Sequence, residues 1–295
     1  MTLDLSHLAV SVRPLAFGSA EDRIRHIHTV HWISYPRADI ALGLFERLFH
    51  YPACTRMPCV LLYGESGIGK TMILEKFARA HRPVYHDKEG HEIRPVLLTQ
   101  MPSGPDERRL CAGILTVIGA PFHTAEKIAT LETLTHVMLR RLCVRVVVFD
   151  EVHNLLAGSQ REQRRALNVL KTLANVLQAV IIAVGTRDAL LAIQTDAQVA
   201  RRFEPLELPR WTEDASFRAF VASLLKVLPL RKASAITDRE CIQLLLRRSD
   251  GVTAQICAII AQSAEIAIQN GSETIDLALL DHVARRQHLE PQWPQ

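Results

Sequence analysis

Short, uninterrupted apolar runs recur along the first two thirds of the chain. They are CVLLY (59–63), PVLLT (95–99), VRVVVF (144–149) and AVIIAV (179–184). Such runs, rich in valine and isoleucine, are typical of parallel strands buried on both faces of a sheet. Segments with helical character lie between or before them, including residues 37–49, where Ile40, Leu44 and Leu48 recur every four residues, and residues 71–81 and 160–177. This alternation predicts an α/β domain with a parallel sheet.

The pattern changes after Trp211. Strand-like runs stop, and amphipathic helical stretches cover residues 214–228, 237–249, 253–269 and 274–287. We therefore expect three parts: an N-terminal extension over residues 1–35, the α/β domain over residues 36–210, and a small all-helical domain over residues 211–295.

Composition and charge restrict the partners and the cellular compartment that we expect. Among 295 residues, 48% are apolar and 22% charged, which is ordinary for a globular protein, and the net charge of +4 permits nucleic-acid binding only through local basic patches. The six cysteines form no CxxC pair, as expected for a reduced, cytoplasmic protein. The chain starts without a basic and apolar leader pattern, and no apolar run approaches the roughly 20 residues of a membrane span, so we expect no membrane partner.

A phosphate-binding motif follows the first predicted strand. Gly64, Gly69, Lys70 and Thr71 match G-x-x-x-x-G-K-[ST]. In this motif glycines let backbone N–H groups surround phosphate oxygens, the lysine reaches the β- and γ-phosphates, and the threonine hydroxyl binds Mg²⁺. The sequence therefore predicts ATP as ligand, with Mg²⁺, and a binding loop made of Gly64, Glu65, Ser66, Gly67, Ile68, Gly69, Lys70, Thr71 and Met72.

Two carboxylates end the third predicted strand. Asp150 is suited to bind Mg²⁺, directly or through water, and Glu151 is suited to polarise a water for attack on the γ-phosphate. Together with Lys70 they predict a hydrolytic site for a nucleoside triphosphate.

Two interpretations are open for each of three further residues. Thr186 ends the fourth strand, where its hydroxyl would touch the γ-phosphate or the attacking water, or else cap the next helix. Arg201 and Arg202 lie near the end of the α/β domain. One of them, preferably Arg202, would reach the γ-phosphate of a neighbouring subunit; the alternative is a surface pair bound to carboxylates or DNA.

These motifs resemble those of the AAA+ ATPases. A more specific likeness covers nearly the whole chain: YPRA, RMPCVLLYGESGIGKT, FDEVHNLLAGS-REQR, VGTRDAL-AIQTD and ARRFEPLELPRW resemble the TniB family of bacterial transposition ATPases. The resemblance implies a protein that binds ATP, assembles into rings or filaments on double-stranded DNA and recruits a DDE transposase, which a TniQ-type target-selection protein can accompany. Its role would be similar to that of the phage Mu B protein and of TnsC-type regulators.

One position departs from the general AAA+ pattern. The helical domain of these proteins often carries a nucleotide-sensing arginine at the start of a helix, and this chain has Gln255 near that place. Glutamine supplies no cation, so the resemblance implies slow, regulatory hydrolysis more than it implies weak binding.

Two basic patches are candidates for DNA contact. Arg161, Arg164, Arg165 and Lys171 share a helix face, and Arg108 and Arg109 follow the second strand. Arginines there would neutralise phosphates without reading sequence, although a charged helix face is more often simply solvated. Aromatic residues make up only 5% of the chain, so we expect no base-stacking platform.

Two other functions are compatible with the same predicted nucleotide-binding residues. A loader or remodeller of another protein, such as a replicative helicase, would need its client, whereas a transposition regulator would assemble on naked duplex DNA. A small-molecule P-loop kinase would be a monomer that transfers phosphate to a metabolite, and the helical region after Trp211 argues against it.

Overall fold

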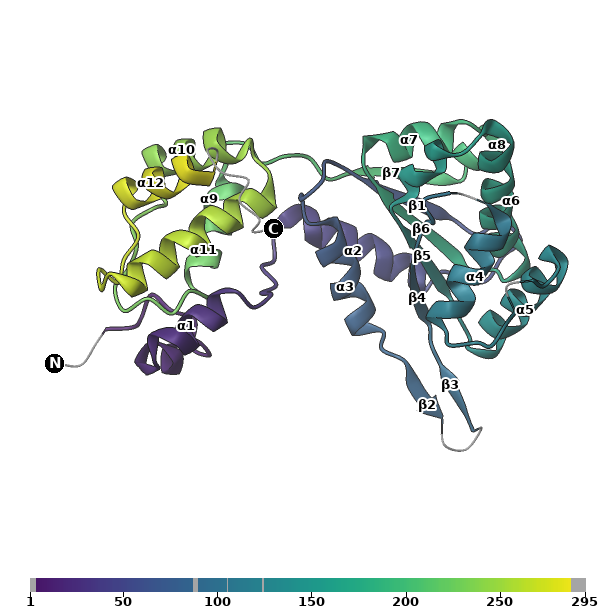
Figure 1. The fold of residues 1–295 in the computed structure, drawn as a ribbon, viewed down its shortest axis with the longest axis horizontal. Helices are drawn as coiled ribbons and strands as arrows, with labels where there is room; N and C mark the ends of the chain where they lie inside the picture. Colours follow the sequence, from purple (N-terminus) through teal and green to yellow (C-terminus); the bar gives the residue numbers. More distant parts are fainter. Residues whose placement is uncertain (1–3, 87–89, 105, 124, 288–295) are drawn as a thin grey trace. The chain divides into compact units, whose positions relative to one another are not determined.

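The structure, a computed structural model, describes residues 4–86, 90–104, 106–123 and 125–287. They divide into two compact units (Figure 1). The α/β unit contains Arg37–Pro209, and the helical unit contains the described residues up to Pro36 and from Arg210 onwards. No described helix has both the length and the apolar character needed to cross a bilayer.

A five-stranded parallel sheet forms the centre of the α/β unit and confirms the predicted fold class. Its order is β4-β5-β6-β1-β7. The central strands are buried on both faces, which is why they read as continuous apolar runs. The strands are β1 (Cys59–Tyr63), β4 (Val96–Gln100), β5 (Val146–Asp150), β6 (Val180–Gly185) and β7 (Phe203–Glu207).

Three of the strands were not predicted from the sequence. β7 contains Pro205 and two glutamates, and only Phe203 in it is buried. It lies at the edge of the sheet, where a missing N–H donor is tolerated. The strands β2 (Val84–His86) and β3 (His91–Ile93) form an antiparallel hairpin apart from the main sheet, and each is too short to show a periodic pattern.

Helices cover both faces of the sheet. Figure 1 shows α2 and α3 on one side and α4, α6 and α7 on the other. The helical segments of the unit are α2 (Pro36–Phe49), α3 (Lys70–Ala80), α4 (Glu107–Val117), α5 (Ile128–Arg141), the 3-10 helix η2 (Val152–Ala157), α6 (Gln160–Val176), α7 (Arg187–Gln194) and α8 (Ala197–Ala200).

The helix expected from the spacing of Ile40, Leu44 and Leu48 is present as α2. Leu44 and Leu48 are buried together with Ala41 and Phe45, whereas Ile40 is 60% exposed. The ring of Phe45 packs edge-on against Phe77 of α3, with centroids 5.5 Å apart.

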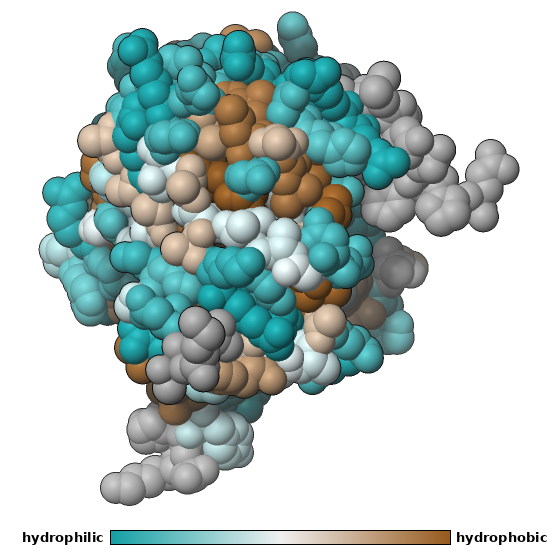
Figure 2. All heavy atoms as spheres, turned by 90° about the vertical axis from the view of Figure 1, so that its left-hand side faces the viewer, coloured by the Kyte–Doolittle hydropathy of each residue, from teal (hydrophilic) through white to brown (hydrophobic). Residues whose placement is uncertain are grey.

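The four helices expected after Trp211 are present in the helical unit. They are α9 (Ala215–Leu225), α10 (Arg239–Ser249), α11 (Thr253–Gln269) and α12 (Leu277–Gln287). Trp211 stacks on Phe220 of α9, with ring centroids 4.8 Å apart. Hydrophilic and apolar residues are intermixed on the face drawn in Figure 2, where most of the surface is hydrophilic.

The N-terminal segment belongs to the helical unit rather than forming a separate extension. It contributes the 3-10 helix η1 (Arg13–Phe17) and the helix α1 (Ala20–Ile27), and Ile27 lies in the same apolar core as α9 to α12. Upstream, Leu5, Leu8, Val12 and Ala16 form a small buried cluster that packs against Val227.

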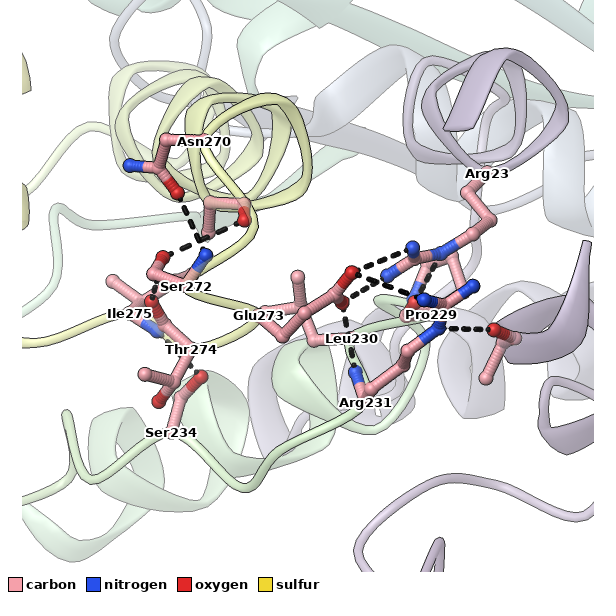
Figure 3. Close-up of polar contacts among 12 residues, drawn as sticks. Arg23, Pro229, Leu230, Arg231, Ser234, Asn270, Ser272, Glu273, Thr274 and Ile275 are labelled. Atoms are coloured by element: carbon pink, nitrogen blue, oxygen red, sulfur yellow. Dashed lines mark hydrogen bonds and ion pairs between the residues drawn. The ribbon is translucent and has the colours of Figure 1, made fainter. Parts of the chain in front are cut away.

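A buried ion pair joins the segment to the rest of this unit (Figure 3). The guanidinium of Arg23, only 2% exposed, donates to both carboxylate oxygens of Glu273 and to the carbonyl of Pro229. Glu273 also accepts from the backbone N–H of Arg231, at 3.2 Å, and the Arg231 side chain donates to the carbonyl of Ala16. Every polar atom of the Arg23–Glu273 pair therefore has a partner, as a buried pair requires.

We expect Arg23→Met to lower the free energy of unfolding of the helical unit by about 3–5 kcal/mol, because it leaves Glu273 buried without its counter-charge. Burial raises the pKa of Glu273, but the hydrogen bonds from Arg23 and Arg231 outweigh burial and hold this pKa below its usual value. The pair therefore stabilises the unit above a pH of about 4.3, the pKa in the unfolded chain, and this stabilisation is lost as the pH falls through the lower, folded-state pKa.

Urea denaturation followed by tryptophan fluorescence measures this effect, because all three tryptophans of the chain lie outside the α/β unit. Arg25→Ala is the matched control, because Arg25 lies on the same helix and pairs with Glu21 in solvent, so its loss should leave the midpoint unchanged. Equal midpoints for the Arg23 and Arg25 variants would contradict the assigned role of the buried pair.

Candidate nucleotide-binding site

The predicted phosphate loop connects β1 to α3. Gly64 begins it, and a Cβ atom there would lie 2.3 Å from the carbonyl oxygen of Leu208, so only glycine fits. Gly69 precedes the first residue of α3 with φ +102°, a conformation that favours glycine. Between them Ile68 is 2% exposed and anchors the loop to the unit. Glu65, Ser66, Gly67 and Met72 are at least partly accessible.

Lys70 is held inside this loop. Its ammonium group donates to the carbonyl oxygens of Gly64, at 2.9 Å, and Glu65, at 2.7 Å, and the residue is 8% exposed. Burial lowers the pKa of Lys70, and the nearby carboxylates of Asp150, Glu151 and Glu65 partly oppose this shift. A buried ammonium whose partners are neutral carbonyls is well placed to bind an anion.

Thr71 and Asp150 meet at the end of this loop. The Thr71 hydroxyl donates to Oδ2 of Asp150 at 3.3 Å, and the other carboxylate oxygen accepts from the Glu151 N–H at 2.8 Å. A hydroxyl and a carboxylate are hard oxygen ligands, and Mg²⁺ usually takes one or two protein ligands beside phosphate oxygens. The two residues that were predicted to bind Mg²⁺ therefore lie together and suit that ion chemically.

Glu151 follows β5 in a left-handed conformation, with φ +58° and ψ 36°. This conformation is uncommon for a residue with a side chain and often marks a functional site. The Glu151 carboxylate is 46% exposed and lies 3.2 Å from Nε2 of His153. His153 lies within the motif FDEVHNLLAGS quoted above, but no role was assigned to it from the sequence.

Thr186 lies at the end of β6, between the strands that carry the other site residues. The order β5-β6-β1 puts it between the phosphate loop and the acidic pair. Thr186 precedes α7, but its side chain makes no capping hydrogen bond, and its hydroxyl is buried without a partner. The capping alternative is therefore not what the hydroxyl does in this structure, and an unpartnered buried hydroxyl is expected where a ligand supplies the missing bond.

The two candidate arginines differ in their surroundings. Arg202 is half-buried, and its guanidinium donates to the Asn175 side chain of α6 at 2.6 Å. Arg201 is exposed, and its side chain has no polar partner among the described residues. Arg202, which the sequence favoured, is thus held by its own α/β unit, and Arg201 is the arginine available to another molecule.

The two predicted basic patches lie close to each other. α4 packs against α6, and the charges of both Arg109 and Arg165 act on Glu162. Hydrogen bonds from Ser159 are the main cause of the lowered pKa of Glu162, and the two arginines lower it further. Ser159 and Glu162 form the capping box that starts α6.

The arginines of these patches are not equally accessible. Arg161, Arg164 and Arg165 are exposed on the first two turns of α6, and Arg109 is exposed beside Asp106, with which it pairs at 3.3 Å. Arg108 is half-buried and donates to the carbonyl of Glu126. Arg109 therefore lies near the exposed arginines of α6, whereas the Arg108 side chain is hydrogen-bonded within its own unit.

Several solved structures share the fold of this chain. The chain is similar to the Aeropyrum pernix ORC2 protein in its ADPNP–ADP complexes, with 15% identity, a TM-score of 0.62, and coverage of 92% of this chain and 72% of that one. It is also similar to the Aeropyrum pernix ORC1 protein in complex with DNA, with 15% identity, a TM-score of 0.60, and coverage of 90% and 69%. Cdc6p of Pyrobaculum aerophilum has 17% identity, a TM-score of 0.54, and coverage of 92% and 68%. At these identities the likeness shows the fold alone, which is that of an AAA+ protein.

The family follows from the sequence itself. Residues 23–213 match the family described as the bacterial TniB protein, which confirms the resemblance noted above. The match covers more than half of the chain, so the chain belongs to the TniB family. No curated protein matches the chain.

We expect Thr186→Val to raise the free energy of unfolding by about 1 kcal/mol, because it removes a buried hydroxyl that has no partner. Thr135→Val is the matched control. Thr135 is also buried, but its hydroxyl donates to the carbonyl of Leu131 at 2.7 Å, so its loss should lower the free energy by a similar amount.

Urea denaturation without nucleotide, followed by circular dichroism, compares the two variants. Changes of the same sign would contradict the assignment of Thr186 as an unsatisfied site residue.

Proposed function

We propose that this chain is an ATP-dependent regulator of DNA transposition. In its ATP form it assembles on double-stranded target DNA and recruits a DDE transposase, and ATP hydrolysis disassembles the complex. The observation that carries the nucleotide part is the convergence of Lys70, Thr71, Asp150, Glu151 and the unpartnered Thr186 hydroxyl at one edge of the sheet. Membership of the TniB family supports the transposition part.

Hydrolysis uses these residues in distinct roles. Lys70 exchanges its loop carbonyls for the β- and γ-phosphates. Thr71 and Asp150 would hold Mg²⁺, which would supply charge neutralisation to the phosphates when bound. Glu151 accepts a proton from water as the water oxygen bonds to the γ-phosphorus and the bond to the ADP oxygen breaks. The Thr186 hydroxyl donates to the γ-phosphate or orients the attacking water.

A second copy of the chain completes the site. Arg201 is exposed, has no polar partner among the described residues of its own chain and follows α8 directly. Placed against a neighbour's γ-phosphate, it would stabilise the charge that develops during transfer. We therefore propose that Arg201, rather than Arg202, acts across the contact between subunits in a ring or helical filament.

Duplex DNA binds through phosphate contacts. Arg109, Arg161, Arg164 and Arg165 form the basic surface, and the charges of two of them already reach Glu162. The Aeropyrum pernix ORC1 structure contains DNA, which agrees with a DNA-binding use of this fold. Recruitment of a DDE transposase, and of a TniQ-type target-selection protein, rests on the family alone. Gln255 is exposed on α11 and supplies no cation, so we propose that hydrolysis is slow.

Electron microscopy with linear duplex DNA tests the proposal. The protein is imaged without nucleotide, with a slowly hydrolysed ATP analogue, and as Lys70→Ala with that analogue. Because Lys70 supplies the cation for the phosphates, we expect rings or filaments on DNA only in the second condition. Protein that stays off DNA in all three would contradict the proposal and favour a loader that needs its protein client.

The basic surface makes a separate prediction. Replacing Arg161, Arg164 and Arg165 by alanine should weaken binding to unrelated duplexes equally. It should also reduce the slope of log K against log salt by about 1 for each DNA phosphate that the variant no longer neutralises. Fluorescence anisotropy over a salt series, with the ATP analogue present, measures this slope.

Arg79→Ala is the control, because Arg79 is an exposed arginine of α3 that pairs with Glu75 and lies outside the basic surface. An unchanged slope in the triple variant would remove α6 from the DNA-binding surface.

A further inference from the structure

We propose that His153 is a positioning residue that holds the Glu151 carboxylate in place for ATP hydrolysis. The inference rests on the proposed function, because it concerns the same hydrolytic site. It assigns a role to a residue outside the phosphate loop, the acidic pair and the candidate arginines.

The first observation is the contact with Glu151. Nε2 of His153 lies 3.2 Å from Oε2 of Glu151. The two groups are in ion-pair contact at this distance when the imidazole is protonated. The contact involves one carboxylate oxygen, Oε2, and leaves the other available to a water. Because the Glu151 side chain is 46% exposed and makes no side-chain hydrogen bond within the described part of the chain, the ion-pair contact with His153 is what restricts its orientation.

The second observation concerns Nδ1, the other nitrogen of the His153 ring. Nδ1 of His153 is buried and has no hydrogen-bond partner. Within the described residues, one other buried side-chain atom shares this condition, the hydroxyl oxygen of Thr186. Buried polar atoms without partners are rare in proteins and call for an explanation. Here one belongs to the residue that contacts Glu151, and the other to the residue that follows Gly185 of β6.

The third observation links His153 to the strand that carries Thr186. A Cβ atom at Gly185 would lie 3.3 Å from Nδ1 and 3.3 Å from the backbone nitrogen of His153. The absence of a side chain at Gly185 therefore lets the imidazole lie directly against the end of β6, one residue before Thr186. This contact connects the His153–Glu151 pair to the end of β6 that precedes Thr186.

A purely structural role fits these contacts less well. A histidine kept for packing would bury an apolar ring edge or satisfy both nitrogens, whereas this ring has one buried nitrogen unsatisfied and gives its only described side-chain polar contact to the proposed catalytic carboxylate. The arrangement is that of a side chain oriented by its neighbours so as to orient another.

Three substitutions separate the functions of the two ring nitrogens. His153→Gln places an N–H donor near the position of Nε2, within reach of Glu151. His153→Asn places a polar atom near Nδ1, beside Gly185, but does not reach Glu151. His153→Ala removes both. Steady-state ATP hydrolysis with duplex DNA gives kcat and KM, and titration with a fluorescent ATP analogue measures nucleotide binding independently of turnover.

We expect the alanine and asparagine variants to lose about tenfold or more in kcat, with KM and nucleotide affinity unchanged within about twofold, because only orientation of the base is lost. His153→Gln should stay within about threefold of the unsubstituted protein. In the Glu151→Gln background, His153→Ala should cause no further loss, because His153 acts through Glu151.

The outcomes distinguish the inference from the function on which it rests. If the unsubstituted protein hydrolyses ATP and Glu151→Gln does not, but His153→Ala keeps full kcat, the role of His153 alone is overturned. Equal loss in the alanine and glutamine variants, or a loss of nucleotide affinity that accompanies the loss of kcat, also overturns it. If the unsubstituted protein shows no hydrolysis above Glu151→Gln, the hydrolytic function and this inference fall together.

Discussion

The parallel register of β1, β6 and β5 determines where the nucleotide site forms. Tyr63 of β1 pairs with Gly185 of β6, and Ala183 of β6 pairs with Phe149 of β5. The three strands therefore end at nearly the same level, and the chain leaves each of them towards the same edge. A shift of this register by one residue would turn every strand side chain to the opposite face and separate the phosphate loop from the acidic pair.

The sequence was most informative where function depends on consecutive residues. The phosphate loop and the Asp150–Glu151 pair are local patterns attached to buried apolar runs, and each was found at the end of its predicted strand. Contacts between distant segments were not predictable in this way. The left-handed backbone of Glu151, its contact with His153 and the nearness of Arg109 to α6 all depend on tertiary packing. β7 was missed for a different reason, since Pro205 is a breaker in most strands and is tolerated here only because the strand is at an edge.

The site also shows how a protein without ligand keeps groups ready for one. Lys70 is bonded to carbonyls of its own loop, Thr186 has no partner, and Glu151 has an uncommon backbone conformation. Each of these features opposes folding to some extent, and the buried apolar residues of the sheet and its helices offset that cost. Electrostatic groups that are already oriented need little rearrangement when phosphate arrives, which is the usual origin of their effect on rate.

The pairing of Arg23 with Glu273 has a consequence for biosynthesis. The residues that build the helical unit come from both ends of the chain, and the whole α/β unit is encoded between them. During translation, the N-terminal segment therefore leaves the ribosome long before α9 to α12 exist, and its buried arginine has no native counter-charge in that interval. The α/β unit, which is continuous in sequence, can fold first, and the helical unit closes only after α9 to α12 have been synthesised.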